Sequence, residues 1–183
     1  MMELNLPNQI ETERLVLKKH TLDRNYVQLW VDSINQNLPW LSRFLPHFSK
    51  PITFEEEKAF LRSLICGEKE NNYAVWNKKT NELMGSIGAF NFEEKMGKKS
   101  IELGAILFEK FAGQGYGPEA TKAFEQALYG AGIDSTILKI DSMNTRSRRA
   151  AEKEGHVWDG KETMPKKNHP EIQLLVYRKM KAK

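Results

Sequence analysis

Strand-like alternation and helix-like spacing of apolar residues follow one another along the first part of the chain. Residues 13–19 place Leu15 and Leu17 on one face and predict a first strand. Asp23 can cap a following helix in which apolar residues recur on one side. Thr53 and Glu56 have the spacing of a capping box and predict a second helix. The pattern begins, therefore, with one strand and two helices.

Three further strands are predicted in the middle of the chain, over 73–76, 83–92 and 100–108. The polar segments 79–82 and 95–99 between them have turn character and favour antiparallel hairpins. The second of these strands is almost continuously apolar but contains small residues at 85, 86 and 88. Small residues inside a strand indicate a bulge or a close approach to another backbone.

The order of predicted elements changes after residue 108, where helices and strands alternate. A helix is predicted over 116–131, a strand over 136–142, a helix over 146–154, and strands at 157–158 and 172–178. Alternation of this kind implies a strand–helix–strand crossover and therefore some parallel pairing. No linker or repeat divides the sequence, so we predict a single α/β domain over 1–183.

Composition narrows the class of protein. With 183 residues, 40% apolar and 28% charged, the chain has an ordinary globular balance. Its net charge of +4 is spread along the sequence, which argues against direct nucleic-acid binding. The single cysteine, Cys66, excludes an internal disulfide framework and a cysteine-based metal cluster. We expect a cytoplasmic protein with no signal peptide and no membrane span.

The segment from Phe111 to Ala120 has the most informative pattern. Gly113, Gly115 and Gly117 stand on alternate positions between a predicted strand and the first turn of a helix. Such a loop can direct several backbone N–H groups to one point, where the helix dipole also favours an anion. The order is neither that of a dinucleotide fingerprint nor that of a P-loop. A phosphate site and a simple tight turn both fit the loop itself.

Resemblance to a known family separates these alternatives. The glycine loop, the segment 144–155, and the segments 37–41 and 53–56 resemble the GCN5-related N-acetyltransferase (GNAT) superfamily, in particular its branch of ribosomal-protein alanine and serine N-acetyltransferases (RimJ/RimL-like). The likeness implies a mixed, mostly antiparallel sheet that splays open, with helices on both faces. Ala112 departs from the family pattern, because Gln or Arg is usual at that position.

The resemblance also implies a binding site for acetyl-coenzyme A and no metal. The end of the strand before the loop would pair with the pantetheine arm, and the loop amides would hold the pyrophosphate. The cofactor-binding residues implied in this way are Ala105, Leu107, Gly113, Gln114, Gly115, Tyr116, Gly117 and Asn144.

Acetyl transfer to an amine requires a neutral amine and a proton for the leaving thiolate. Deprotonating an α-amine at pH 7 costs ~1 kcal/mol, against roughly 4.6 kcal/mol for a lysine, so a weak base suffices for an α-amine. Ser147 is the candidate proton donor by resemblance, with a helix N-cap as the alternative. Glu102 is the candidate base, with a solvated strand residue as the alternative. Arg146, Arg148 and Arg149 could favour the 3′-phosphate of the coenzyme or form a solvated helix face.

The histidines and the aromatic residues around Trp40 are interpreted mainly as structural residues. The histidines at 20, 47, 156 and 169 share no metal-ligand spacing, and we expect surface or packing roles for them. Trp40 and nearby aromatic residues are expected in the core or in the wall of a substrate groove.

The function that the resemblance implies is direct acetyl transfer from acetyl-coenzyme A to a primary amine. The acceptor expected first is the N-terminal α-amine of a peptide or ribosomal protein. A polyamine or aminoglycoside acceptor remains open, as does a non-catalytic protein that binds acyl-coenzyme A. A homodimer is an expectation by family likeness.

Overall fold

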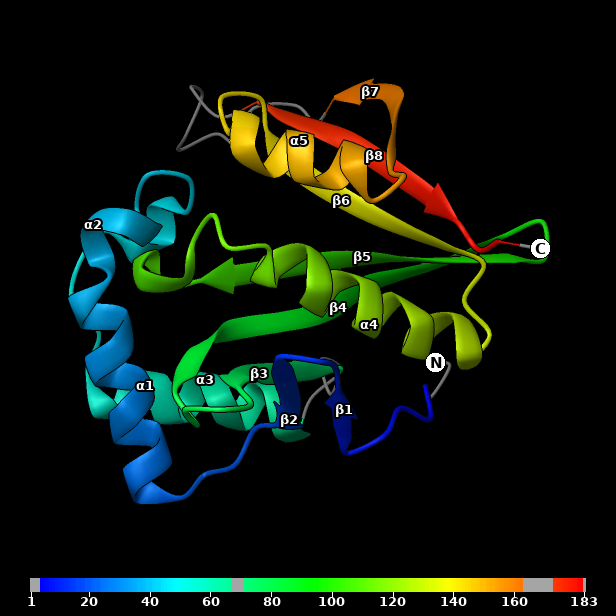
Figure 1. Cartoon of the computed structure of the whole chain (residues 1–183). Helices are drawn as coiled ribbons and strands as arrows, with labels where there is room; N and C mark the ends of the chain where they lie inside the picture. Colours follow the sequence, from blue (N-terminus) through cyan, green and yellow to red (C-terminus); the bar gives the residue numbers. More distant parts are fainter. Residues whose placement is uncertain (1–3, 67–70, 163–172, 183) are drawn as a thin grey trace.

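The structure is a computed structural model that describes residues 4–66, 71–162 and 173–182. These residues form one eight-stranded sheet with the order β1-β2-β3-β4-β5-β6-β8-β7 (Figure 1). The strands are β1 (Gln9–Glu11), β2 (Leu15–Lys19), β3 (Asn72–Asn77), β4 (Leu83–Lys95), β5 (Lys98–Leu107), β6 (Ser135–Asp141), β7 (Val157–Glu162) and β8 (Leu174–Met180). The helices are α1 (Arg24–Gln36), α2 (Leu38–Leu41), α3 (Phe54–Cys66), α4 (Tyr116–Gly130) and α5 (Thr145–Lys153), with short 3-10 turns at Pro46–Phe48 and Glu109–Phe111.

Most elements lie where the sequence pattern predicts them. The capping box at Thr53 is confirmed: the Glu56 carboxylate accepts a hydrogen bond from the Thr53 N–H at 2.8 Å, and the Thr53 hydroxyl accepts one from the Glu56 N–H. β1 and α2 were not predicted, because three or four residues are too few to show a period. The predicted strand over 172–178 corresponds to β8, and its first residue, Ile172, lies outside the described residues.

The splay predicted by resemblance is confirmed. β5 and β6 form the one parallel pair among the described strands, and their register runs from Ser100↔Ser135 to Leu103↔Leu138. Beyond this point β5 continues to Leu107 and β6 to Asp141 without pairing with each other, and Figure 1 shows the two strands diverging. The sheet therefore opens into a V whose arms are the ends of β5 and β6.

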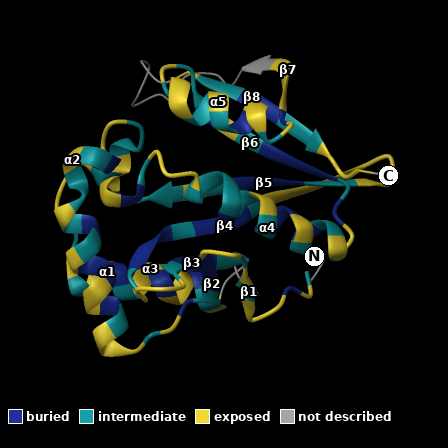
Figure 2. Cartoon of the chain, viewed as in Figure 1, coloured by how far each residue is buried: buried dark blue, intermediate teal, exposed yellow. Residues whose placement is uncertain are grey.

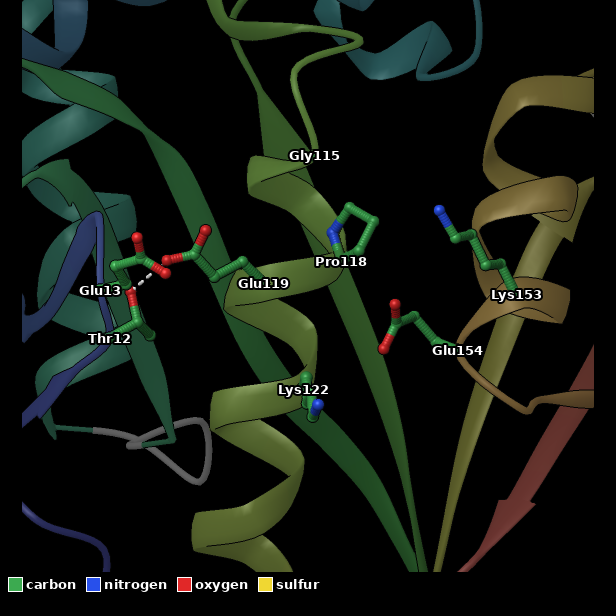
Figure 3. Close-up of a pocket in the computed structure, with 8 residues that line it drawn as sticks. All are labelled: Thr12, Glu13, Gly115, Pro118, Glu119, Lys122, Lys153 and Glu154. Carbon is green, nitrogen blue, oxygen red and sulfur yellow. Dashed lines mark hydrogen bonds between the residues drawn. The ribbon is translucent and has the colours of Figure 1, made fainter.

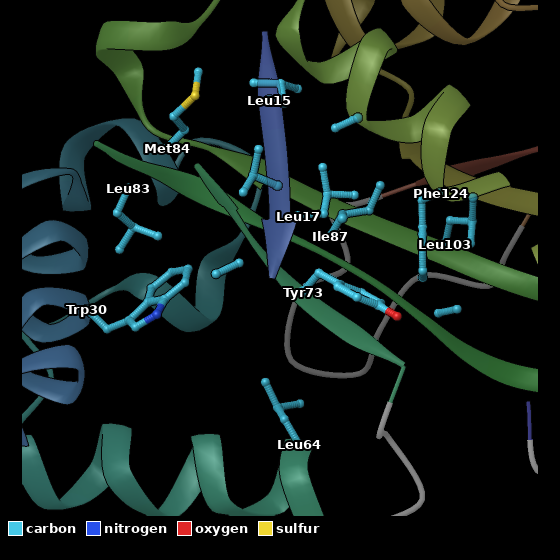
Figure 4. Close-up of a cluster of buried hydrophobic side chains, with 14 of the residues drawn as sticks. Leu15, Leu17, Trp30, Leu64, Tyr73, Leu83, Met84, Ile87, Leu103 and Phe124 are labelled. Atoms are coloured by element: carbon cyan, nitrogen blue, oxygen red, sulfur yellow. The ribbon is translucent and has the colours of Figure 1, made fainter. Parts of the chain in front are cut away.

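Helices cover both faces of the sheet (Figures 1 and 2). On one face Tyr73 of β3 packs against Phe124 of α4, with ring centroids 5.4 Å apart (Figure 4). Elsewhere on β3, Trp76 meets Tyr26 of α1. The α5 side of the V has a small core of its own, made of Ile140, Ala151 and Tyr177.

Glycines in β4 allow neighbouring strands to approach closely, as the run of small residues predicts. A Cβ built on Gly85, whose φ is +148°, would lie 2.0 Å from the carbonyl oxygen of Ile106 in β5. A Cβ on Gly88 would lie 1.8 Å from Oδ1 of Asn72 in β3. A side chain at Gly85 would therefore force β4 away from β5, the strand that leads to the glycine loop.

A buried group of charged and polar side chains joins α4 to the α5 side of the V. Glu125 of α4 is only 1% exposed, and its carboxylate accepts hydrogen bonds from the Thr136 hydroxyl at 2.6 Å and from Lys179 Nζ at 2.7 Å. His156 Nε2 lies 2.9 Å from the same carboxylate, with an alignment too poor for a hydrogen bond. Burial raises the pKa of Glu125, but its contacts with His156, Lys179 and Thr136 outweigh burial and lower it overall.

Replacing Glu125 by glutamine is expected to destabilise the protein by roughly 3 kcal/mol, because Lys179 would keep a largely buried charge without its partner. A carboxylate whose pKa is lowered by folding stabilises the folded state at pH values above its ordinary pKa, here 4.5. This stabilisation is lost as the pH falls through the lower pKa of the folded state. The difference between wild type and Glu125→Gln in urea unfolding should thus be full at pH 7 and shrink below pH 4.5.

The matched control is Glu11→Gln, which removes a solvent-exposed ion pair with Lys78 and should change the unfolding midpoint little. A difference for Glu125→Gln that stays constant from pH 7 to pH 3.5 would contradict the assignment.

In the ranges that the structure describes, no helix combines the length and the apolar character needed to cross a bilayer.

Candidate functional site

The glycine loop leaves β5, makes one 3-10 turn and enters α4. Gly113 and Gly115 have φ values of +79° and +81°, a left-handed conformation that other residues adopt at a cost. The N–H groups of residues 113 to 117 donate to no acceptor within the described part of the chain. Five consecutive unpaired donors next to the N-terminus of a 15-residue helix form a site suited to an anion.

Arg14, which sequence reasoning did not single out, supports this loop from the start of β2. Its Nη1 donates to the carbonyl oxygen of Gln114 at 3.1 Å, and its Nε donates to Glu119 of α4 at 2.7 Å. Glu119 also accepts a hydrogen bond from the Thr12 hydroxyl at 2.6 Å. Burial raises the pKa of Glu119, but these contacts with Thr12 and Arg14 lower it overall, so the carboxylate stays charged. The loop is thus tied to the sheet through its carbonyl side, which leaves its N–H side open.

Ala112, the departure from the family pattern, has extended backbone and no polar side chain. The side chain of Gln114 turns back to the carbonyl oxygen of Lys110, at 2.8 Å. One guanidinium nitrogen of Arg14 would lie 3.4 Å from a Cβ built on Gly115. Arg14 therefore supplies a guanidinium beside the loop, although a different strand provides it.

The end of β5 directs main-chain groups into the V. The N–H of Phe108 donates to the carbonyl oxygen of Met84 in β4, and successive residues of a strand point their polar groups to opposite sides. Leu107 and Ala105 therefore direct theirs away from β4, towards the gap left by β6. The carbonyl oxygen of Leu107 already accepts a hydrogen bond from Trp40 Nε1 of α2 at 2.9 Å. Ala105 is exposed.

Asn144 and Ser147 lie at the start of α5, on the other arm of the V. Asn144 is the N-cap, and its side chain accepts a hydrogen bond from the Ser147 N–H at 3.1 Å. The alternative that Ser147 caps this helix is wrong, because the helix begins at Thr145 and Ser147 lies within its first turn. Within the described residues the Ser147 hydroxyl makes no hydrogen bond, so its proton is free to be donated.

Glu102 is not the solvated residue that was the alternative to a base. It is 8% exposed, and its Oε2 lies 2.6 Å from Lys139 Nζ of β6 and accepts a hydrogen bond from Asn91 at 2.9 Å. Lys139 directly follows Leu138, the last residue of β6 that pairs with β5. The ion pair therefore joins the two arms at the vertex of the V. The ion pair and the hydrogen bond hold the Glu102 carboxylate in place between the two arms.

The three arginines of α5 do not form one cluster. Arg146 lies over the ring of Trp40, with its guanidinium carbon 4.9 Å from the ring centroid. Arg148 donates to the hydroxyl of Tyr177 at 3.1 Å and to the carbonyl oxygen of Ser142 at 3.0 Å. Arg149 is exposed. The solvated-face interpretation fits Arg149 and does not fit Arg148.

A groove of about 390 Å³ lies between α4 and α5, directly beside the glycine loop (Figure 3). It is lined by Thr12, Glu13, Gly115, Pro118, Glu119, Lys122, Lys153 and Glu154. Figure 3 shows Lys122 on α4 and Lys153 on α5, on the two sides of this groove. Sequence reasoning missed both lysines, because single charged residues on two separate helices carry no signal that the fold brings them together.

The histidines at positions 20 and 156 have the packing role that the sequence suggested. His20 is buried beside Tyr26, whose hydroxyl lies 2.7 Å from His20 Nδ1, and burial together with the nearby charge of Lys19 lowers the pKa of His20 to about 4. His169 lies outside the described residues. In the part of the chain that is described, no three His, Cys, Asp or Glu residues gather as metal ligands would.

Comparison with known proteins identifies the fold and the family. Residues 14–157 match the family model of the acetyltransferase (GNAT) domain. The chain therefore belongs to the GNAT acetyltransferase family, as the resemblance of its motifs indicated. No curated protein sequence gives a significant match.

Several solved structures share the fold at low sequence identity. RimL, a ribosomal L7/L12 alpha-N-protein acetyltransferase solved with coenzyme A, has a TM-score of 0.79 at 20% identity over 94% of this chain and 97% of its own. The microcin C7 self-immunity acetyltransferase MccE, solved with acetyl-CoA and AMP, has a TM-score of 0.78 at 19% identity over 92% and 93%. The ribosomal-protein-S5-alanine acetyltransferase from Vibrio fischeri has a TM-score of 0.77 at 16% identity over 94% and 96%.

Proposed function

We propose that the protein transfers acetyl from acetyl-coenzyme A directly to a primary amine, and that the amine is the N-terminal α-amine of a peptide or ribosomal protein. The single observation that supports this most strongly is the row of five unpaired N–H groups at residues 113 to 117. Two structural neighbours have coenzyme A or acetyl-coenzyme A in their names, and two are ribosomal-protein acetyltransferases.

The residues on this side of the molecule fit the coenzyme. The amides of residues 113 to 117 would hold the pyrophosphate, and a Cβ at Gly113 or Gly115 would require a strained backbone. Lys122 and Lys153 line the adjoining groove and would receive the remaining phosphate. Ala105, the N–H of Leu107 and Asn144 would hold the pantetheine arm. The bound coenzyme would supply an activated acetyl thioester.

The protein's own contribution to the chemistry is then small. Ser147 would hold a proton on its hydroxyl, ready for the thiolate that leaves when the amine attacks. An α-amine is already partly neutral at pH 7, so water suffices to remove its proton. Glu102, which is held by Lys139 and Asn91, is the carboxylate that would assist this step through water.

The proposal is tested by thiol release from acetyl-coenzyme A with serine- and alanine-initiated peptides, polyamines and aminoglycosides as acceptors. We expect turnover with peptides, blocked when the peptide N-terminus is already acetylated. A coenzyme affinity measured by calorimetry without turnover on any acceptor would instead identify a non-catalytic binding protein. Turnover confined to polyamines or aminoglycosides would show that the acceptor is a small amine and not a peptide.

A further inference from the structure

We propose that the mouth of the V selects acceptors that carry negative charge directly behind the reacting amine, namely the N-termini of acidic peptides, and that Arg43 and Arg146 recognise this charge. The inference rests on the proposed acetyltransferase function and specifies its acceptor.

Trp40 is fixed between the two arms of the V. It comes from α2, its Nε1 donates to the carbonyl oxygen of Leu107 at the end of β5, and its ring lies against Arg146 of α5. Arg43 lies over the same ring, with its guanidinium carbon 5.1 Å from the centroid. Two cations therefore lie against one indole, beside the strand end that would pair with the pantetheine arm.

Both guanidinium groups remain available to a ligand. Arg43 and Arg146 are exposed, and neither forms an ion pair with a carboxylate in the described residues. By contrast Arg14 pairs with Glu119. Stacking on an aromatic ring fixes the plane of a guanidinium, while its N–H edge can still donate to a carboxylate in a bidentate manner.

The charges near the vertex do not favour a cationic acceptor. A polyamine or aminoglycoside would need carboxylates around the acceptor position, but Glu102 is neutralised by Lys139 at 2.6 Å. The coenzyme phosphates would have other partners in the loop amides and in Lys122 and Lys153, which line the groove together with Glu13, Glu119 and Glu154. Arg43 and Arg146 are therefore left for the acceptor.

The test uses two peptides of equal length that begin with serine and continue with either three acidic or three lysine residues, each with a fluorophore at its C-terminus. Their binding to the protein saturated with coenzyme A is followed by fluorescence anisotropy. We expect the acidic peptide to bind about tenfold more tightly at low salt, with a smaller difference at high salt. The double variant Arg43→Gln/Arg146→Gln should lose this preference, and Arg43→Glu/Arg146→Glu should reverse it.

Arg62→Gln is a control for the loss of a positive charge elsewhere, because it removes an exposed arginine of α3 and should keep the preference. Equal binding of the two peptides, or a preference that survives in the double glutamine variant, would overturn the inference. Displacement of the acidic peptide by an equal concentration of free aspartate or phosphoserine would overturn the assignment to a peptide.

Thiol release with the same peptides tests the proposed function separately. Faster release with the acidic peptide supports both proposals. Equal release with both peptides keeps the acetyltransferase and overturns the charge selection. Absence of release, together with a binding preference that depends on the two arginines, overturns the acetyltransferase and leaves the recognition of acidic peptides standing.

Discussion

Alanine at Gly115 is expected to weaken coenzyme A binding by roughly 10- to 100-fold, and alanine at Gly113 should have a similar effect. Loss of one hydrogen bond to a charged group costs about 1.5–3 kcal/mol, and tenfold in affinity is about 1.4 kcal/mol. Either substitution would strain a backbone held at positive φ, and relief of that strain would turn loop N–H groups away from the pyrophosphate. Calorimetric titration with coenzyme A measures the change.

Gly97 provides the matched control for this experiment. Its φ is +73°, and a Cβ built on it meets no atom within 4 Å, as at Gly113. It lies in the turn between β4 and β5, outside the candidate site. Gly97→Ala should show the same stability cost of roughly 1–2 kcal/mol with unchanged affinity. If all three variants bind the coenzyme like the wild type, the loop does not hold a phosphate.

Alanine at Ser147 should lower kcat by about 10²- to 10⁴-fold, which is the range that a positioned proton donor contributes. Coenzyme affinity and thermal stability should change little, because the Ser147 hydroxyl makes no hydrogen bond within the described residues and the helix cap is provided by Asn144. Steady-state thiol release with a peptide acceptor, together with a coenzyme titration, gives both quantities.

Ser147→Cys separates a chemical role from a structural one. A thiol occupies nearly the same space and can donate a proton, so this variant should recover part of the rate that Ser147→Ala loses. Full activity of the alanine variant would remove Ser147 from the chemistry, and an equal loss in both variants would indicate a packing effect.

The order of elements could be predicted from the sequence because the signals are local. Each signal comes from residues that are close in sequence. This is true of the capping box at Thr53, of the apolar side of α4 and of the alternate glycines after β5. The resemblance of the loop and of residues 144–155 to one family added the splay, which periodicity alone does not show.

The contacts that define the candidate site could not be predicted because their partners are distant in sequence. Arg14 meets Glu119 across 105 residues, and Trp40 meets Leu107 across 67. Local patterns carry no information about such pairs. Glu102 illustrates the same limit: its position on the strand suggested a base, whereas its environment depends on Lys139, which a different strand supplies.

The short seam between β5 and β6 has a mechanical consequence. Four consecutive register pairs, the Glu102–Lys139 contact and the buried group around Glu125 connect the main sheet to a unit with its own small core. A molecule that touches the glycine loop on one arm and Asn144 on the other adds a further connection, at the open end of the V. Occupancy of the V should consequently slow hydrogen exchange in β6 and α5, at amides that the molecule itself does not cover.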